Sequence, residues 1–347
     1  MSIPDTIQDL PPKWAHFCLQ VERFVYQDLG VQLESKRLLL AVSGGVDSKA
    51  LLAIFYLLRS RLRLQLLAAH LDHGLRPESS REAQATRALC TRLGLPCLTG
   101  RTNIQTLARK TGRGLEEAGR LLRYRFLFGL KRKHGCDLIL TAHQANDLAE
   151  DVLLRLIRGT GWPALCGMPA FDGSSGLLRP LLLTPKAELI EFVRALEIPW
   201  QEDPSNQDPS FRRNRIRHRI YPLLEEENPG FLASVEHLWR QGGLDKDFWE
   251  QRMQSLRRCE RKQEGEIFLP GLVLSRLHQA ERLRWYRDAL KRLGPGQVLA
   301  ENLFQLDRAW QSGTGPKRIQ FPGGKEATVD RGGVTIYALS QRGQRPR

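Results

Sequence analysis

The chain has 347 residues, of which 41% are hydrophobic, and a formal net charge of +15 at pH 7. That length is enough for two domains with cores of their own, and no apolar run reaches the roughly 20 residues of a membrane-spanning helix. The basic excess favours a polyanionic partner such as a nucleic acid, although composition alone does not exclude an ordinary basic protein. The six cysteines form no CxxC pair and no zinc-spaced cluster, which argues against a structural metal or a redox centre. The first residues show neither a secretory nor a transit pattern, so we expect a cytoplasmic protein.

A polar turn with two glycines joins an apolar run at residues 38–42 to an apolar helical pattern at residues 50–55. The turn consists of Ser43, Gly44, Gly45, Val46, Asp47 and Ser48. A buried strand that enters a helix through such a turn forms an anion site, because unpaired N–H groups and the helix dipole both favour negative charge. Glycines admit a phosphate close to the backbone, the serines add hydroxyl donors, and Asp47 can hold magnesium against the phosphates.

The spacing of this turn matches neither GxxxxGK[ST] nor GxGxxG. The alternative interpretation is an ordinary strand–helix turn in which Asp47 and Ser48 cap the helix. Two serines, two glycines and an aspartate are more than capping requires, so the sequence predicts a phosphate-binding turn.

Apolar periodicity predicts strands and helices that alternate along the first half of the chain. Strands are expected at residues 38–42, 64–69, 97–99 and 137–141, and helices at residues 14–30, 50–58, 78–93, 115–133 and 148–157. This alternation predicts an α/β fold with a parallel five-stranded sheet and helices on both faces. Ligands of such sheets bind beyond the carboxyl ends of the strands. We therefore expect residues 43–48, 70–76 and 142–147 to face one crevice.

The rest of the chain predicts a second domain. Glycine and proline mark an irregular connection at residues 159–185, and a helix with proline in its first turn follows at residues 185–196. Further helices are expected at residues 231–240, 244–261 and 275–293, and short strands at residues 317–338. Residues 1–224 are predicted to form the first domain, with its N-terminal helix. Residues 225–347 are predicted to form a smaller, mainly helical domain that ends in short strands.

One acidic residue follows the second predicted strand. Asp72 can orient or ligate magnesium there, and Arg76 can neutralise a phosphate. The alternative is a loop in which Asp72 caps the next helix.

A second acidic group begins the helix after the fourth predicted strand. Its members, spaced to cluster on one side of a helix, are Asp147, Glu150 and Asp151. The packing side of the same helix is expected to be formed by Leu148, Val152 and Leu156. The cluster indicates a cation site, for a metal or an ammonium group. A solvated acidic helix start, favoured by the dipole, is an equally good interpretation.

The densest basic run lies at residues 211–219. Its arginines are Arg212, Arg213, Arg215, Arg217 and Arg219. Five such cations repel one another unless an anion is present, and Phe211 and Tyr221 flank the run where they can stack on bases. We therefore expect the run to contact phosphates. A second basic group lies on the helix predicted at residues 115–133, where charged faces are usually only solvated.

The turn SGGVDS resembles that of the pyrophosphate-loop ATPases, which adenylate a carbonyl oxygen and release pyrophosphate. Further blocks, in the same order, are similar to the tRNA(Ile)-lysidine synthetase family. They read AHLDHGLRPES, EEAGRLLRYRFL, TAHQANDLAEDVLLRLIRGTG and EDPSNQDPSFRRNRIR. The resemblance covers residues 38–224, and the region after Pro229 resembles only loosely that family's first C-terminal domain. The further C-terminal domain of longer members is not expected here.

This resemblance implies an adenine nucleotide α-hydrolase-like fold and a cytoplasmic ligase. ATP would activate the C2 carbonyl of the wobble cytidine in the CAU anticodon of an isoleucine tRNA. The side-chain amine of free lysine would then attack, which leaves lysidine, AMP and pyrophosphate and changes the tRNA from methionine to isoleucine identity. No membrane is expected to take part, and a homodimer is the one oligomeric state considered.

The resemblance also implies roles for single residues. The turn from Ser43 to Ser48 would hold the pyrophosphate part of ATP, with magnesium on Asp47 and Asp72. Asp147 and Glu150 match the family's acidic pair and would bind the lysine substrate. The catalytic residues would be Asp47, Asp72, Arg123, His143 and Arg215, with Arg212 as an alternative to the last. The tRNA contacts would be Arg212, Arg213, Arg215, Arg217 and Arg219, and the second domain would bind tRNA as well.

One block departs from the family's usual TAHHxDDQxET. Here Gln144, Asn146, Leu148 and Asp151 replace His, Asp, Gln and Thr, which removes two contacts available to metal or substrate. A tRNA-binding homologue with impaired catalysis is therefore one alternative. Another pyrophosphate-loop enzyme, such as a tRNA cytidine thiolase or an amide-forming synthetase, is a second. The scattered cysteines, and an N-terminal region without an amidotransferase cysteine, argue against it.

Overall fold

The structure is a computed structural model that describes residues 3–72, 79–112, 114–201, 207–313 and 316–339. The chain divides into two compact units, Met1–Gly243 and Leu244–Arg347. This division falls inside one long helix, α10 (Phe231–Arg257), whereas the sequence analysis places the domain boundary at residues 224 and 225. The two helices expected at residues 231–240 and 244–261 are thus one continuous helix, because Gly242 and Gly243 do not interrupt it.

The first unit is built on a six-stranded sheet in the order β3-β2-β1-β4-β6-β5. Its strands are β1 (Arg37–Ala41), β2 (Gln65–Asp72), β3 (Cys97–Arg101), β4 (Leu138–Leu140), β5 (Phe171–Asp172) and β6 (Leu177–Leu178). All neighbours are parallel except β5 and β6, and the four strands expected from the sequence are confirmed. The prediction of five strands is corrected to six. β5 and β6 have two residues each, too few to produce a readable alternation.

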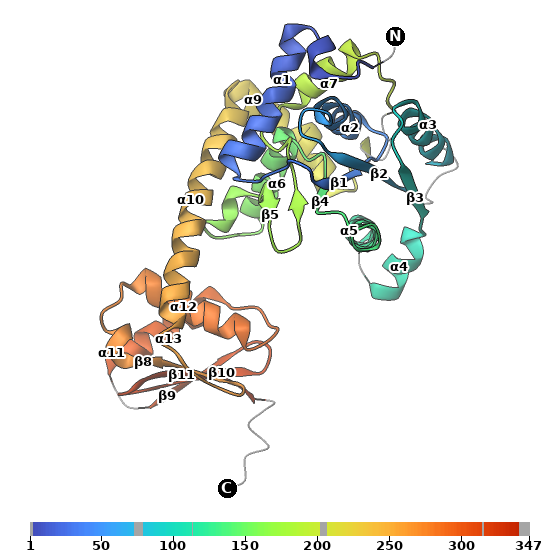
Figure 1. Ribbon diagram of the computed structural model, residues 1–347. Helices are drawn as coiled ribbons and strands as arrows, with labels where there is room; N and C mark the ends of the chain where they lie inside the picture. The colour runs from blue at the N-terminus through green and yellow to red at the C-terminus, as the bar shows by residue number, and fades with distance from the viewer. Residues whose placement is uncertain (1–2, 73–78, 113, 202–206, 314–315, 340–347) are drawn as a thin grey trace. The chain divides into compact units, whose positions relative to one another are not determined.

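Helices cover both faces of this sheet (Figure 1). They are α1 (Pro12–Arg23), α2 (Val46–Leu58), α3 (Ser79–Arg92), α4 (Ile104–Thr111), α5 (Leu115–Lys133), α6 (Ala145–Ile157) and α7 (Lys186–Ala195), with short turns η1 (Ile7–Asp9), η2 (Phe24–Asp28) and η3 (Ala164–Cys166). Alternate residues of β1 point to opposite faces. Leu38 and Leu40 join a core with α1, α2 and α7, whereas Leu39 joins another with Leu127 of α5. β1 is therefore buried on both sides, and its carboxyl end emerges at the phosphate-type turn.

A third apolar cluster packs α6 against the chain that follows the sheet. That chain contains α8 (Arg212–Arg215), the π-helical turn η5 (Ile216–Ile220), α9 (Tyr221–Glu227) and the start of α10. Leu148 and Val152 of α6 lie in this cluster with Tyr221 and Val235. Leu156, expected on the same packing side, is 60% exposed, so that part of the prediction is wrong. It lies in the last turn of α6, beyond the residues that α9 and α10 cover.

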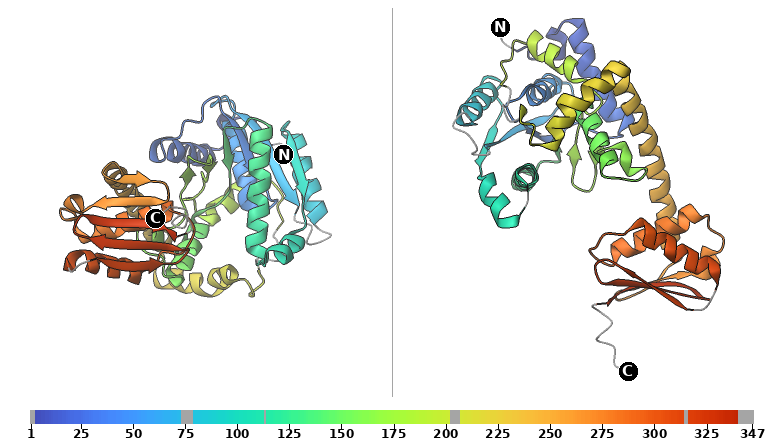
Figure 2. Two further views of the ribbon diagram at one scale, coloured as in Figure 1. Left: turned by 90° about the horizontal axis from the view of Figure 1, so that it is seen from below. Right: turned by 180° about the vertical axis from the view of Figure 1, so that it is seen from behind.

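The second unit contains a five-stranded antiparallel sheet in the order β7-β8-β11-β10-β9, with helices on one face (Figure 2). The elements are β7 (Arg261–Gln263), β8 (Glu266–Pro270), α11 (Gly271–Leu274), α12 (Gln279–Arg292), α13 (Ala300–Ser312), β9 (Lys317–Phe321), β10 (Lys325–Asp330) and β11 (Gly333–Ala338). Trp285 and Tyr286 of α12 are its largest fully buried side chains. The strands expected at residues 317–338 are confirmed, whereas β7 and β8 were missed. Along the described residues, no helix combines the length and apolarity that a membrane span requires.

We expect the first unit to depend on Leu140 and not on Leu156. Leu140 of β4 is fully buried between β1 and β6, and its replacement by alanine should lower the free energy of unfolding by about 2–5 kcal/mol. The matched change Leu156→Ala, at an exposed position of α6, should alter it by less than about 0.5 kcal/mol. Urea denaturation of both variants tests this, and equal losses would contradict the assigned packing.

Candidate functional site

The predicted phosphate turn lies between the end of β1 and the start of α2. Gly44 adopts a φ of +100°, which a residue with a side chain rarely does. The Ser48 hydroxyl oxygen accepts hydrogen bonds from the backbone N–H groups of Ser43, at 3.1 Å, and Gly44, at 3.2 Å, and its proton goes to the Gly45 carbonyl at 2.9 Å. Ser48, only 4% exposed, therefore shapes the turn. In this conformation its hydroxyl proton is not available to a phosphate.

Asp47 lies in the first turn of α2, and one of its carboxylate oxygens, Oδ1, is buried without a hydrogen-bond partner. The pKa of Asp47 is raised to about 6, first by burial and then by the negative charges of Asp147 and Glu150, while the positive charges of Lys186 and Arg217 oppose the rise. The predicted turn and the predicted acidic pair are thus close enough to interact, as the parallel sheet led us to expect. An ionised Asp47 at this position is poorly stabilised by the protein alone.

The carboxyl end of β2 contributes Asp72 to the same edge of the sheet. Asp72 is 7% exposed, and one of its oxygens lies 3.6 Å from Nε of Arg101. Nearby, a ring nitrogen of His70 lies 2.8 Å from the backbone oxygen of Val42, and burial lowers the pKa of His70. Arg76, expected to neutralise a phosphate, lies outside the described residues.

His143 follows β4 in a strongly basic environment. Its Nδ1 lies 3.0 Å from the hydroxyl oxygen of Thr141. Burial holds the pKa of His143 well below its usual value, and nearby positive charges lower it further; these belong to Arg179, Arg213, Arg120 and Arg123. The imidazole is therefore neutral at physiological pH. The structure places His143 within electrostatic reach of Arg123 and also of Arg179, which has no pattern around it in the sequence because it stands alone in the irregular connection.

The acidic pair on α6 is held by two arginines of the predicted tRNA-binding run. Arg213 donates from Nε to Glu150 at 2.6 Å and from Nη2 to Asp147 at 2.8 Å. Arg217 donates from Nε and Nη2 to the two oxygens of Glu150, at 2.6 and 3.0 Å. Glu150 is only 2% exposed. The negative charge expected beside the arginine run is thus supplied, for these two arginines, by Asp147 and Glu150 of the protein itself.

The other members of the run do not share this arrangement. One nitrogen of Arg215 donates to the carbonyl groups of Pro209 and Ser210, each at 2.8 Å, so this predicted catalytic residue holds the preceding loop. Arg212 and Arg219 are exposed. The run therefore divides into two arginines that bind the acidic pair, one that binds the backbone, and two that face solvent.

The three carboxylates that the sequence places on one side of α6 do not form a single cluster. Asp151 pairs with Arg155, one turn further along α6, at 2.8 Å, and so does not extend the acidic pair. Arg155 also donates to the Ala164 carbonyl, which turns Asp151 toward the connection after α6. Within the described residues, no group of three or more histidines, cysteines or carboxylates has the arrangement of a metal site.

Gln144 and Asn146, the two unusual residues of the block, have structural roles that the sequence analysis did not foresee. The Gln144 side chain accepts from the N–H of Asn146 at 2.6 Å and caps α6. The Asn146 side chain accepts from the N–H of Lys186 at 3.1 Å and donates to the hydroxyl of Tyr221 at 2.9 Å. One amide thus joins the starts of α6, α7 and α9. Because the Tyr221 hydroxyl gives its own proton to Glu225 at 2.6 Å, the side chain at position 146 must both donate and accept.

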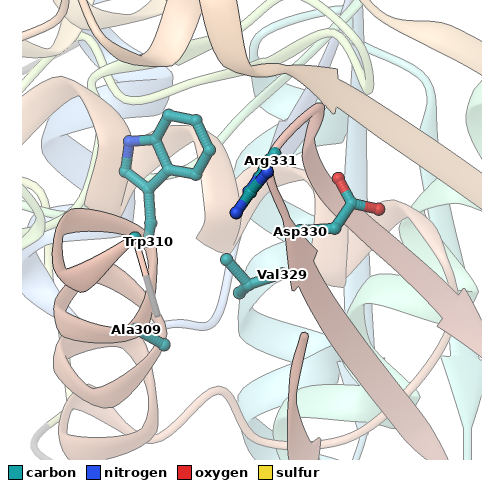
Figure 3. A pocket seen from close by; sticks show the side chains of 6 residues that line it. Ala309, Trp310, Val329, Asp330 and Arg331 are labelled. Carbon is teal, nitrogen blue, oxygen red and sulfur yellow. The ribbon is translucent and has the colours of Figure 1, made fainter. Parts of the chain in front are cut away.

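The second unit has a pocket of its own, of about 220 Å³, at the end of α13. Trp310 lies across it from Val329 and Arg331 of the β10–β11 hairpin (Figure 3). Its lining includes none of the residues discussed above. The candidate site is therefore the edge of the first sheet.

Comparison with known proteins connects this geometry to a family. Residues 16–224 match the PP-loop domain family. The chain is 47% identical over 311 residues to the tRNA(Ile)-lysidine synthase of Nitratidesulfovibrio vulgaris, which covers 85% of this chain and 90% of that protein. The chain belongs to the tRNA(Ile)-lysidine synthase family. The resemblance carried by the sequence blocks is thereby confirmed.

This chain spans little more than half the length of two other tRNA(Ile)-lysidine synthases that it matches. It is 37% identical over 318 residues to that of Thermus thermophilus, and 36% identical over 233 residues to that of Thermosipho africanus. These matches cover 89% and 65% of this chain, and 58% and 54% of those two proteins. Among solved structures, the U34-tRNA thiolase NcsA of Methanococcus maripaludis has a TM-score of 0.52 at 18% identity, covering 65% of this chain and 78% of its own. That likeness supports the PP-loop fold alone.

We expect Asn146→Asp to destabilise the first unit by about 1–2 kcal/mol. The Tyr221 hydroxyl already donates its proton to Glu225 at 2.6 Å, so an aspartate at position 146 would face its oxygen without a shared proton. In urea denaturation, Tyr221→Phe should remove most of this penalty when combined with Asn146→Asp. Additive losses in the double variant would show that the two side chains are not coupled.

Asp47→Asn should stabilise the ligand-free protein in a pH-dependent way. The pKa of Asp47 is raised to about 6 in the folded protein, so its ionisation lowers stability as the pH rises from about 4 to about 6. The variant should therefore exceed the wild type by up to about 3 kcal/mol at about pH 8, and by almost nothing at about pH 4. Urea denaturation at both pH values measures this. Asp247→Asn, at an exposed position of α10, is the control and should show no such dependence.

Proposed function

We propose that this protein joins lysine to C2 of the wobble cytidine in the CAU anticodon of an isoleucine tRNA, with conversion of ATP to AMP and pyrophosphate. ATP would adenylate the C2 oxygen and release pyrophosphate. The lysine side-chain amine would then form the C–N bond as AMP leaves. Identity of 47% along most of a tRNA(Ile)-lysidine synthase is the observation that carries this proposal.

The turn from Ser43 to Ser48 is suited to the pyrophosphate part of ATP. The N-terminus of α2 attracts negative charge there, and no lysine of the P-loop type is needed because the bond breaks at the α-phosphate. The neutral His143 and the guanidinium of Arg123 are suited to stabilise charge that develops on the adenylate. In this arrangement the protein binds the leaving group and the reacting phosphate at one sheet edge.

Magnesium fits the carboxylates at this edge. Asp47 has a buried oxygen without a partner, and Asp72 is a second buried carboxylate on the neighbouring strand. Carboxylate oxygens are the ligands that magnesium prefers in proteins, and the ion would supply charge neutralisation of the ATP phosphates. It would also keep Asp47 ionised.

Asp147 and Glu150 are our proposed site for the lysine ammonium, since they provide two carboxylates beside Asp47. Once free of the arginines, one of them can accept the proton that the attacking amine loses. The exposed Arg212 and Arg219 are suited to tRNA phosphates, as is the net positive charge of the chain. The second unit is proposed to bind tRNA as well.

The reaction is tested by incubating the protein with ATP, magnesium, labelled lysine and an isoleucine tRNA with a CAU anticodon. Lysine should appear at the wobble base together with AMP. Asp47→Ala should abolish the ATP–pyrophosphate step, while its affinity for tRNA should stay within about twofold of the wild type, because tRNA contacts lie elsewhere. Salt-sensitive tRNA binding without any AMP release would instead identify a binding homologue that has lost catalysis.

A further inference from the structure

In the ligand-free protein, the proposed lysine site is already occupied by the protein's own cations. Both oxygens of Glu150 accept from Arg217, and one also accepts from Arg213. One oxygen of Asp147 accepts from Arg213, and the other accepts from the backbone N–H of Gln144 at 3.2 Å. Two carboxylates thus face two guanidinium groups. An ammonium group that arrives alone would find neither excess negative charge nor a free oxygen on Glu150.

The arginines are more accessible than the carboxylates they hold. Their side chains are 23% and 26% exposed, whereas that of Glu150 is 2% exposed. Both come from the short segment formed by α8 and η5, separate from the helix that carries the acidic pair. An incoming anion can therefore meet the guanidinium groups before any cation can reach Glu150.

Both arginines lie within electrostatic reach of residues at the edge of the sheet. The charge of Arg217 acts on Asp47, in the first turn of α2. The charge of Arg213 acts on His143, the residue proposed to stabilise the adenylate. A phosphate bound at this edge would therefore attract both guanidinium groups. Guanidinium groups bind phosphate and carboxylate with the same two-pronged geometry, so the change of partner keeps the hydrogen bonds.

We propose that Arg213 and Arg217 exchange partners when the substrates bind. They neutralise Asp147 and Glu150 in the free protein and transfer to a phosphate group, which leaves the acidic pair to the lysine ammonium. Each charge is then paired both before and after the exchange. The phosphate comes either from ATP or from the tRNA backbone. The inference rests on the proposed function, and it makes lysine binding conditional on a phosphate ligand.

Lysine affinity measured by calorimetry tests the exchange on the unmodified protein. Lysine is titrated into the free protein, into its complex with a non-hydrolysable ATP analogue and magnesium, and into its complex with CAU-anticodon isoleucine tRNA. At least one phosphate ligand should lower the lysine Kd about tenfold or more, and the responding arm identifies the phosphate source. Norleucine, which lacks the side-chain ammonium group, should show no such gain. An equal lysine Kd in all three states would overturn the proposal.

A single-charge variant provides the second test. Arg217→Gln leaves Arg213 on the acidic pair, and it should bind lysine in the absence of phosphate ligands about tenfold more tightly than the wild type, with a smaller gain on adding them. Arg155→Gln is the matched control, because it removes an arginine paired with Asp151 on the same helix and should leave the lysine Kd unchanged. Thermal melts establish that both variants are folded. A folded Arg217→Gln protein with wild-type lysine affinity and a wild-type phosphate effect would refute the exchange.

The two proposals fail in distinguishable ways. If lysine is incorporated into tRNA but its Kd does not depend on phosphate ligands, the exchange is wrong and the proposed function stands. If lysine neither binds in any state nor enters tRNA, the proposed function fails and the exchange fails with it.

Discussion

The pairing of two carboxylates on α6 with two arginines on α8 and η5 is the interaction on which the site depends. Glu150 is only 2% exposed, and an unpaired charge in such a place costs several kcal/mol. Arg213 and Arg217 supply the pairing charge and fix the segment that carries them against α6. The apolar cluster of Leu148, Val152 and Tyr221 packs the same elements together. Charge pairing and hydrophobic burial therefore place the arginine segment beside the sheet edge.

The parallel sheet determines why so many ionisable groups meet there. β1, β2 and β4 all end at one edge, where Asp47, Asp72 and His143 lie in surroundings largely shielded from water. The pKa of Asp47 is raised and that of His143 is lowered for the same first reason, which is burial. In this site, burial thus disfavours both the ionised form of the Asp47 carboxyl group and the protonated form of the His143 imidazole. Perturbed groups of this kind are common where catalysis needs them.

Features of the site that are encoded in a short stretch of sequence are easier to predict than contacts between residues far apart in the chain. The turn from Ser43 to Ser48 could be read from the sequence, because its strand, glycines and helix are contiguous. The bond between Asp147 and Arg213 joins residues 66 positions apart, and no local pattern encodes it. The sequence alone indicates lost ligands at Gln144 and Asn146, because the contacts that Asn146 makes with α7 and α9 join segments far apart in the chain. The strands β5 and β6 could not be predicted for a different reason. Each has two residues, which are too few to show an alternation of apolar and polar positions.

The balance of charge at the sheet edge restricts how substrates can be accommodated. Asp147 and Glu150 are paired with Arg213 and Arg217, so the acidic pair of the ligand-free site is matched by two cations. If an anionic nucleotide bound alone and attracted the arginines, the acidic pair would lose part of the positive charge that neutralises it. If a cationic amine bound alone, its positive charge would have no free negative charge to pair with. Taken together, the two substrates restore the balance. A ligase that must join a phosphate-activated base to an amine therefore gains from a site in which neither partner is well accommodated without the other.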